Sequence, residues 1–197
     1  MVGESLDSNY YGTKMKKIII LIFGLPGSGK TTLARAIREI AQDQTIWFNA
    51  DKVRSTLSKD LGFSAESRIE QARRMGCLAS LALDGSDCST AIVDFVNPTV
   101  ETYESFLANL CRPAGSPADR VVETPSRYFV DVSYPVFSVL MRTIKKEECR
   151  FRDTAEVFQH SLSGGVDYSV DNYLTSPEAF REEAIKIQRL SDVLRGS

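Results

Sequence analysis

The sequence predicts a three-layer α/β fold, in which a mostly parallel sheet of five strands lies between two layers of helices. Short apolar runs alternate along the chain with segments of helical pattern, as expected where a crossover helix follows each strand. A glycine-rich turn joins the first apolar run to the first helix, and right-handed crossovers place helices on the sheet. A chain of 197 residues is commonly a single α/β domain.

The first residues of the chain differ in character from the rest. Residues 1–14 read MVGESLDSNYYGTK, which is polar and without periodicity. We expect this segment to be a disordered leader or a remnant of cloning, with Met15 as a natural start. Residues 15–197 are then expected to form the single folded domain.

The first strand and the loop after it carry the strongest motif. Ile18 to Phe23 is a continuous apolar run, and it is followed by GLPGSGKTT at residues 24–32 and by a segment of helical composition from Leu33. This is the phosphate-binding pattern G-x-x-x-x-G-K-[ST] in the strand–loop–helix context that it requires. The sequence therefore predicts a P-loop NTPase fold and a site for a polyphosphate.

Each part of this loop has an expected role. Its glycines allow positive φ and bring backbone N–H groups close to an anion, and the helix start adds further N–H groups. Lys30 is expected to contact the β- and γ-phosphates, and the Thr31 hydroxyl to ligate Mg²⁺. The predicted nucleotide-binding residues are Gly24, Gly27, Ser28, Gly29, Lys30, Thr31 and Thr32.

A second strand over residues 45–50 is expected to end at Asp51. In an open α/β sheet, residues just beyond the carboxyl end of a strand face the ligand crevice. Asp51 is therefore predicted to lie near the phosphates that the first loop binds.

The next segment is expected to be a helix that Ser64 caps and that begins near Ala65. It carries three arginines, at positions 68, 73 and 74. An arginine set of this kind is a ligand-binding group, a solvated face, or a set of partners for Glu66 and Glu70. The residue spacing leaves these alternatives open.

A third buried strand is predicted over residues 89–96, ended by Asn97 and Pro98. Thr99 is expected to cap a helix that continues to about Leu110. Residues 111–126 are rich in proline and glycine and are expected to form a loop.

Two apolar runs, 128–133 and 136–141, compete for the place of the fourth strand. The charged segment 142–165 is either a solvated helix or a mobile lid, and Arg150 and Arg152 are then candidates to cover the transferred phosphate. A short last strand is expected over residues 166–170, before an amphipathic helix that Pro177 opens.

The composition restricts the function classes. The net charge of −2 gives no overall basic field that would attract nucleic acid. The four cysteines are widely spaced, which argues against a zinc site or a redox pair. The longest apolar stretch, at residues 18–23, is too short to span a bilayer, and no signal segment precedes it. We therefore expect a cytoplasmic protein without nucleic-acid or membrane partners.

Three segments together resemble one known family. They read GLPGSGKTT, NADKVRSTLSKDLGFSAESRIEQARR and IVDFVNP. These segments are similar to those of the adenylylsulfate kinase family, whose members use ATP to phosphorylate the 3′-hydroxyl of adenosine 5′-phosphosulfate. The resemblance covers about residues 16–110 and is most specific in DLGFSAESR.

The resemblance implies roles for individual residues. Asp51 matches the second acid of the family's D-G-D segment, which serves the metal and the acceptor hydroxyl. Arg54 and Arg68 match arginines that hold the sulfate and phosphate end of the acceptor, and Phe63 matches an aromatic residue that stacks on its adenine. The resemblance thus implies ATP and Mg²⁺ as cofactors, Lys30 and Asp51 as catalytic residues, and Thr31 and Asp51 as metal ligands.

The chain also departs from the family pattern. The departures lie mainly on the acceptor side, at Asn49, Ala50, Ser67, Gln71 and Asn97. The lid segment 148–158 reads ECRFRDTAEVF and lacks the family's lysine-rich pattern. The donor half is therefore retained, and the acceptor half is partly changed.

The leading hypothesis is an ATP-dependent phosphotransferase acting on the 3′-hydroxyl of adenosine 5′-phosphosulfate, in sulfate assimilation or in sulfation of another molecule. One alternative is a P-loop kinase of another small-molecule or nucleotide hydroxyl, and another is a nucleotide-binding module without transfer activity. Retention of Lys30, Thr31 and Asp51 favours the enzyme. The sequence leaves open whether the protein is a monomer or a homodimer.

Overall fold

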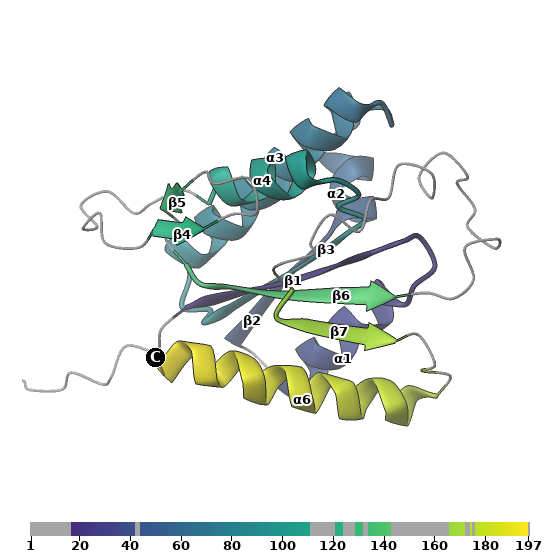
Figure 1. The fold of residues 1–197 in the computed structure, drawn as a ribbon, viewed down its shortest axis with the longest axis vertical. Helices are drawn as coiled ribbons and strands as arrows, with labels where there is room; N and C mark the ends of the chain where they lie inside the picture. The colour runs from purple at the N-terminus through teal and green to yellow at the C-terminus, as the bar shows by residue number, and fades with distance from the viewer. Residues whose placement is uncertain are drawn as a thin grey trace, which may run out of the picture.

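The computed structural model describes residues 17–41, 44–110, 121–123, 129–131, 134–142, 166–171, 174 and 176–196. Its centre is a five-stranded sheet of order β2-β3-β1-β6-β7, in which every neighbouring pair is parallel. Helices cover both faces of this sheet (Figure 1). The predicted three-layer α/β fold is therefore confirmed. The predicted leader at 1–14 and the lid arginines Arg150 and Arg152 lie outside the described residues.

The strand that carries the phosphate-binding loop lies in the middle of the sheet, paired with β3 on one side and β6 on the other. The five strands have the following bounds: β1 Ile18–Gly24, β2 Thr45–Asn49, β3 Thr90–Phe95, β6 Val136–Arg142 and β7 Tyr168–Asp171. A ligand at the carboxyl end of β1 therefore has strands on both sides of it.

The structure settles which apolar run is the fourth strand. Val136–Arg142 pairs with β1, and the backbone N–H of Ile19 donates to the carbonyl of Pro135 at 2.9 Å. The earlier run instead contributes β5, Phe129–Asp131, which pairs antiparallel with β4, Val121–Glu123. These two short strands form a separate small sheet, in which β5 lies beside α4 (Figure 1).

Each face of β1 packs against a different set of helices, because successive side chains of a strand point to opposite faces. Ile18, Ile20 and Ile22 belong to a core cluster with α1, Lys30–Ala41, and α6, Pro177–Gly196. Ile19, Leu21 and Phe23 belong to a second cluster with α2, α3 and α4. The last three helices span Ala50–Thr56, Ala65–Asp84 and Val100–Ala108. The continuous apolar run of β1 thus reflects burial on both faces.

Side-chain caps define where the helices begin. The Ser64 hydroxyl accepts from the backbone N–H of Ser67 at 3.3 Å, and Thr99 forms a reciprocal capping box with Thr102. Both predicted caps are confirmed. A third cap was not predicted: Asn49 ends β2, and its Oδ1 accepts from the N–H of Lys52 at 3.1 Å. The segment after β2 is consequently a helix.

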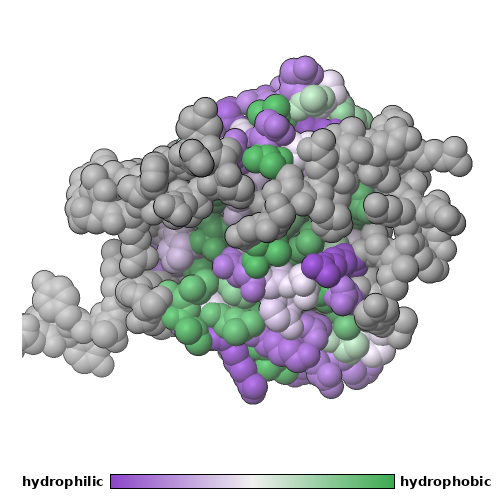
Figure 2. All heavy atoms as spheres, in the orientation of Figure 1, coloured by the Kyte–Doolittle hydropathy of each residue, from purple (hydrophilic) through white to green (hydrophobic). Residues whose placement is uncertain are grey.

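The last helix is amphipathic, as predicted. Ala184 and Ile187 are fully buried against the sheet, whereas Leu190 and Val193 are exposed. Figure 2 shows mainly hydrophilic side chains along the lower edge of the molecule, where α6 lies, with hydrophobic ones gathered toward its C-terminal end. Within the described ranges, no helix combines the length and apolar character that crossing a membrane requires.

Gly76 provides a test of the packing between α3 and α4. A Cβ atom at this position would overlap the carbonyl oxygen of Phe106, which belongs to the backbone of α4. We expect Gly76→Ala to lower the free energy of unfolding by about 1–3 kcal/mol, because the overlap outweighs the better helix propensity of alanine. Urea denaturation measures this change.

Gly62→Ala is the matched control, because a Cβ there would have its nearest neighbour, Ser67 Oγ, at 3.9 Å. Its effect should stay within about 0.5 kcal/mol. A Gly76→Ala protein as stable as the wild type would contradict the close approach of the two helices.

Candidate active site

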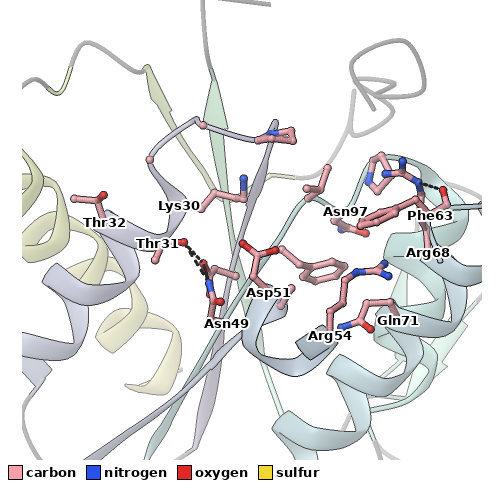
Figure 3. A pocket seen from close by; sticks show the side chains of 18 residues that line it. Lys30, Thr31, Thr32, Asn49, Asp51, Arg54, Phe63, Arg68, Gln71 and Asn97 are labelled. Carbon is pink, nitrogen blue, oxygen red and sulfur yellow. Dashed lines mark hydrogen bonds between the residues drawn. The ribbon is translucent and has the colours of Figure 1, made fainter. Parts of the chain in front are cut away.

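A cavity of about 440 Å³ opens at the carboxyl ends of β1, β2 and β3. The P-loop forms one side of it, and α2, the start of α3 and the segment after β3 form the other. Figure 3 shows Lys30, Thr31 and Thr32 on the first side and Arg54, Phe63, Arg68 and Gln71 on the second, with Asp51 between them. The structure therefore brings most of the sequence-predicted donor residues and the predicted acceptor residues to one pocket; Gly24 and Ser28 are not among its lining residues.

The P-loop is tightly packed from two directions. Its glycines have positive φ, +147° at Gly24, +78° at Gly27 and +88° at Gly29. A Cβ at Gly24 would overlap the carbonyl oxygen of Met141 in β6, and one at Gly29 would lie 3.0 Å from the Phe180 ring of α6. The predicted need for glycine is confirmed, and its cause includes neighbouring elements as well as backbone conformation.

Lys30 lines the P-loop side of the pocket, whereas Ser28 is not among its lining residues. The Nζ atom of Lys30 donates to the carbonyl of Leu25, at the start of the same loop, at 2.7 Å. The Ser28 hydroxyl is buried, and among the described residues it has no hydrogen-bond partner. Thr31 and Thr32 follow in the first turn of α1 and are exposed to solvent. The loop thus presents one cation and two hydroxyl groups near the helix N-terminus.

Asp94 lines the pocket and was not predicted as a site residue from the sequence. Its buried carboxylate accepts from Thr31 Oγ1 at 2.9 Å, from Asn49 Nδ2 at 2.9 Å and from Trp47 Nε1 at 2.8 Å. Burial raises the pKa of Asp94, and the hydrogen bonds from Trp47, Thr31 and Asn49 oppose that shift. The sequence did contain a signal for this residue, because Asp94 is a carboxylate within a buried apolar strand. Burying a charge is costly unless hydrogen-bond donors surround it.

Thr31 and Asp94 fit the requirements of Mg²⁺. The ion prefers oxygen ligands and is usually bound through one or two carboxylates together with phosphate oxygens and water. No group of three or more His, Cys, Asp or Glu side chains that could hold a metal occurs within the described ranges. The Thr31 hydroxyl and the Asp94 carboxylate, together with oxygens of a bound triphosphate, would therefore give the oxygen ligands that Mg²⁺ prefers. Asp51, the other predicted metal ligand, lines the same pocket and is exposed.

Arg54, Phe63 and Arg68 form the acceptor side. The Arg54 guanidinium lies 4.9 Å from the centre of the Phe63 ring and donates to the carbonyl of Gly62 at 2.7 Å. Arg68 Nε donates to the carbonyl of Phe63 at 2.8 Å. Burial and the positive charge of Arg68 lower the pKa of Arg54, and Asp51 opposes that shift. Two neighbouring guanidinium groups favour an anion, which would relieve their repulsion.

The other two arginines of α3 have a structural role. Arg73 and Arg74 each form an ion pair with Glu70, at 2.6 and 2.8 Å, and Arg74 also contacts Asp60 at 2.7 Å. For these two arginines the interpretation as ion-pair partners is correct. Arg68 instead lines the pocket.

Gln71 and Asn97 line the pocket with buried amides. Among the described residues, neither the oxygen nor the nitrogen of either side chain has a hydrogen-bond partner. Asn97 also has a φ of +46°, which is uncommon for a residue other than glycine. A buried polar group without a partner costs about 1–3 kcal/mol, so both amides are suited to bind a ligand or water.

The Glu70 ion pairs predict a measurable titration. Hydrogen bonds from Arg73 and then Arg74 lower the pKa of Glu70 from 4.5 to about 2. Because the pKa is lower in the folded state, the stabilisation is present above pH 4.5 and is lost as the pH falls toward 2. It amounts to about 1 kcal/mol or less, since the pairs are partly exposed.

Carbon-13 NMR titration of the Glu70 carboxyl should show this low pKa. In the Arg73→Met, Arg74→Met double variant it should return toward 4.5. Titration of wild-type Glu70 near 4.5 would contradict the ion pairs.

Comparison with known proteins shows a similarity to one family. The model of the family described as adenylylsulphate kinase matches residues 16–111. An adenylyl-sulfate kinase of Staphylococcus epidermidis is 32% identical over 154 residues, which cover 77% of this chain and 65% of that protein. A second, from Chloroflexus aurantiacus, is 28% identical over 94% of this chain and 96% of that protein. The chain is similar to the adenylylsulphate kinases.

The match to some adenylylsulphate kinases is partial. An adenylyl-sulfate kinase of Lactiplantibacillus plantarum is 36% identical over 98 residues, which span 46% of its length. The chain thus spans about half to two thirds of the length of several curated relatives that it matches.

Solved structures support the fold of the adenylylsulphate kinase family. The Mycobacterium tuberculosis APS kinase CysC, in complex with AMPPNP and APS, superposes with a TM-score of 0.64 at 20% identity, covering 90% of this chain and 98% of that one. Shikimate kinase from Aquifex aeolicus gives a TM-score of 0.53 at 14% identity, covering 89% of this chain and 98% of that one. At these identities the likeness shows a shared kinase fold.

Proposed function

We propose that this protein transfers the γ-phosphate of ATP to the 3′-hydroxyl of adenosine 5′-phosphosulfate. The observation that carries the proposal is the single pocket in which the P-loop faces Arg54, Phe63 and Arg68, with Asp51 between the two sides (Figure 3). Such a pocket can hold a nucleotide donor and an anionic nucleotide acceptor at the same time. Similarity to the adenylylsulphate kinases supports the same reaction.

The donor side is suited to hold ATP. Positive φ at the loop glycines allows backbone N–H groups to come close to an anion, and the N-terminus of α1 would add to the positive potential there. Lys30 would contact the β- and γ-phosphates and stabilise the charge on the transferred group. Mg²⁺, bound by Thr31 and Asp94, would supply further neutralisation of the phosphate charge.

In this proposal, Asp51 acts on the acceptor hydroxyl. It lies in the first turn of α2, exposed to the pocket between Lys30 and the acceptor arginines. A carboxylate there can orient the 3′-hydroxyl and accept its proton as the phosphorus–oxygen bond forms. Transfer in this site is therefore positioning and charge stabilisation, without a covalent enzyme intermediate.

The acceptor side matches a nucleotide that carries sulfate and phosphate. Arg54 and Arg68 offer charge-assisted hydrogen bonds to the anionic end, and the exposed ring of Phe63 offers a face for an adenine base. The buried amides of Gln71 and Asn97 provide further hydrogen-bond donors and acceptors.

The proposal includes Mg²⁺ as cofactor, a cytoplasmic location and a role in sulfate assimilation. ATP is the expected phosphoryl donor there, and the four widely spaced cysteines of the sequence are expected to be reduced thiols. A homo-oligomer is part of the proposal, since a structural neighbour is described as a hexameric APS kinase, from Thiobacillus denitrificans.

A second candidate function is phosphorylation of a different small-molecule hydroxyl. Gln71 and Asn97 favour it, because they stand where the family motif has asparagine and serine and so change the hydrogen-bonding groups of the acceptor side. The same donor chemistry would then act on another acceptor.

The test is ADP formation from ATP and Mg²⁺ with and without adenosine 5′-phosphosulfate, at equal enzyme concentration. We expect ADP release that depends on the acceptor, with one 3′-phosphoadenylylsulfate formed per ADP. The Lys30→Ala variant is the blank. AMP, gluconate and shikimate serve as competing acceptors in parallel reactions. No stimulation by adenosine 5′-phosphosulfate, in protein that binds ATP, would overturn the proposal in favour of another acceptor or of binding without transfer.

A further inference from the structure

Asn49 joins the two halves of the pocket through one side chain. Its Nδ2 donates to Asp94 Oδ2 at 2.9 Å and approaches Thr31 Oγ1 at 3.3 Å, on the donor side. Its Oδ1 accepts from the backbone N–H of Lys52 at 3.1 Å, at the start of α2. One amide therefore contacts β3, α1 and α2 together.

The short helix α2 depends on this contact for its position. It has seven residues, of which Ala50 and Val53 are the buried ones, so its packing area is small. It nevertheless carries Asp51 and Arg54, which face the pocket from the acceptor side. Any rotation of α2 would move both of these side chains relative to Lys30.

The Asn49 amide uses both its oxygen, as an acceptor, and its nitrogen, as a donor. A cap needs an oxygen that accepts from the helix N–H, and the Asp94 carboxylate needs a donor. Asparagine satisfies both without adding charge. Aspartate would keep the cap but would place a second carboxylate where Nδ2 now lies, 2.9 Å from Asp94. Serine would keep the cap and lose the donor.

We infer that Asn49 is a positioning residue that holds α2, and with it Asp51, against the metal-binding side of the pocket. Because the Asn49 amide is neutral, it donates a hydrogen bond to the Asp94 carboxylate without charge repulsion. Asp94 therefore keeps its contact with Thr31 before any metal binds. The family's D-G-D segment begins with an acid at this position, and this chain replaces that charge with a hydrogen bond. The effect on turnover rests on the proposed function, whereas the effect on metal-free stability does not.

Thermal unfolding with and without Mg²⁺, in the absence of nucleotide, tests the inference on the whole chain. Without metal, Asn49→Asp should unfold at least about 4 °C below the wild type, because two carboxylates then face each other. Added Mg²⁺ should restore most of that difference in Asn49→Asp and should raise the wild-type melting temperature much less. A role limited to capping predicts no difference, since asparagine and aspartate cap helices equally well.

Ser64→Asp is the matched control, because Ser64 also caps a helix through its side-chain oxygen. Its melting temperature should not respond to Mg²⁺ more than that of the wild type. An Asn49→Asp protein with wild-type stability and a wild-type response to Mg²⁺ would overturn the inference.

Asn49→Ser separates positioning from charge. Its melting temperature should fall by a few degrees, because the buried Asp94 loses one hydrogen-bond donor. Its ADP dissociation constant should stay within about threefold, while kcat falls about tenfold or more. An unchanged kcat would show that the amide does not position α2. If no tested acceptor is phosphorylated, the thermal experiment still decides whether Asn49 bridges the two sides, so failure of the proposed function and failure of this inference are distinguishable.

Discussion

Replacing Lys30 with alanine is expected to lower the rate of phosphoryl transfer by about 10³-fold or more. The side chain begins α1, and its Nζ lies within the P-loop, 2.7 Å from the carbonyl of Leu25. It is the cation best placed to stabilise charge on the transferred group. Since Lys30 is outside the two buried core clusters, the variant should keep the folded stability of the wild type.

The measurement is ADP formation at saturating ATP, together with a urea unfolding curve for each protein. Lys59→Ala is the control, because Lys59 is an exposed lysine that does not line the pocket. Its rate should remain within about twofold of the wild type. A Lys30→Ala rate within tenfold of the wild type would rule out the proposed mechanism.

The Asp51→Asn variant is expected to lose about 10²- to 10⁴-fold in kcat, the range for removal of a general base. Asparagine has nearly the same shape and retains the first turn of α2, but it carries no charge and does not accept the proton of the hydroxyl. In Figure 3, Asp51 lies outside the P-loop, between Lys30 and the acceptor arginines. The affinity for ATP should therefore change by only a few-fold.

Steady-state kinetics with separate determination of the ATP dissociation constant would distinguish loss of chemistry from loss of binding. Asp87→Asn is the control: Asp87 is exposed and lies just before β3, at the edge of the sheet opposite to the pocket. Equal losses of kcat and of ATP affinity would assign Asp51 to nucleotide binding instead of acceptor activation.

The donor half of the site could be predicted because its determinants are local in sequence. Strand, glycine loop and helix follow one another within residues 18–41, and the loop motif alone fixes which groups meet the phosphates. The caps Ser64 and Thr99 were predictable for the same reason, since a cap and its helix are neighbours in the chain.

The role of Asp94 was not predictable from local pattern. Its partners Thr31, Trp47 and Asn49 come from two other elements, and they meet it because β3 lies between β1 and β2 in the sheet. Only the order of the strands makes this carboxylate a neighbour of the P-loop. A motif search along the chain therefore finds Thr31 and misses the residue that contacts it.

The sequence left the choice between the two apolar runs at 128–133 and 136–141 open for a similar reason. Both have the composition of a strand, and pairing with β1 is what makes Val136–Arg142 part of the main sheet. The helix α2 escaped prediction because it is short and polar and depends on the cap that Asn49 provides. The resemblance to the family supplied Arg54, Phe63 and Arg68, whose side chains come from α2, from the segment before α3 and from α3 itself.

Phe180 of α6 packs against Gly29 in the P-loop, although the ribosome makes it about 150 residues later. The neighbour of β1 on one side, β6, is also made late. At roughly 5–20 residues per second, the P-loop waits about 8–30 s for these contacts during synthesis. A nascent chain is therefore expected to acquire its full affinity for ATP only after α6 has emerged from the ribosome.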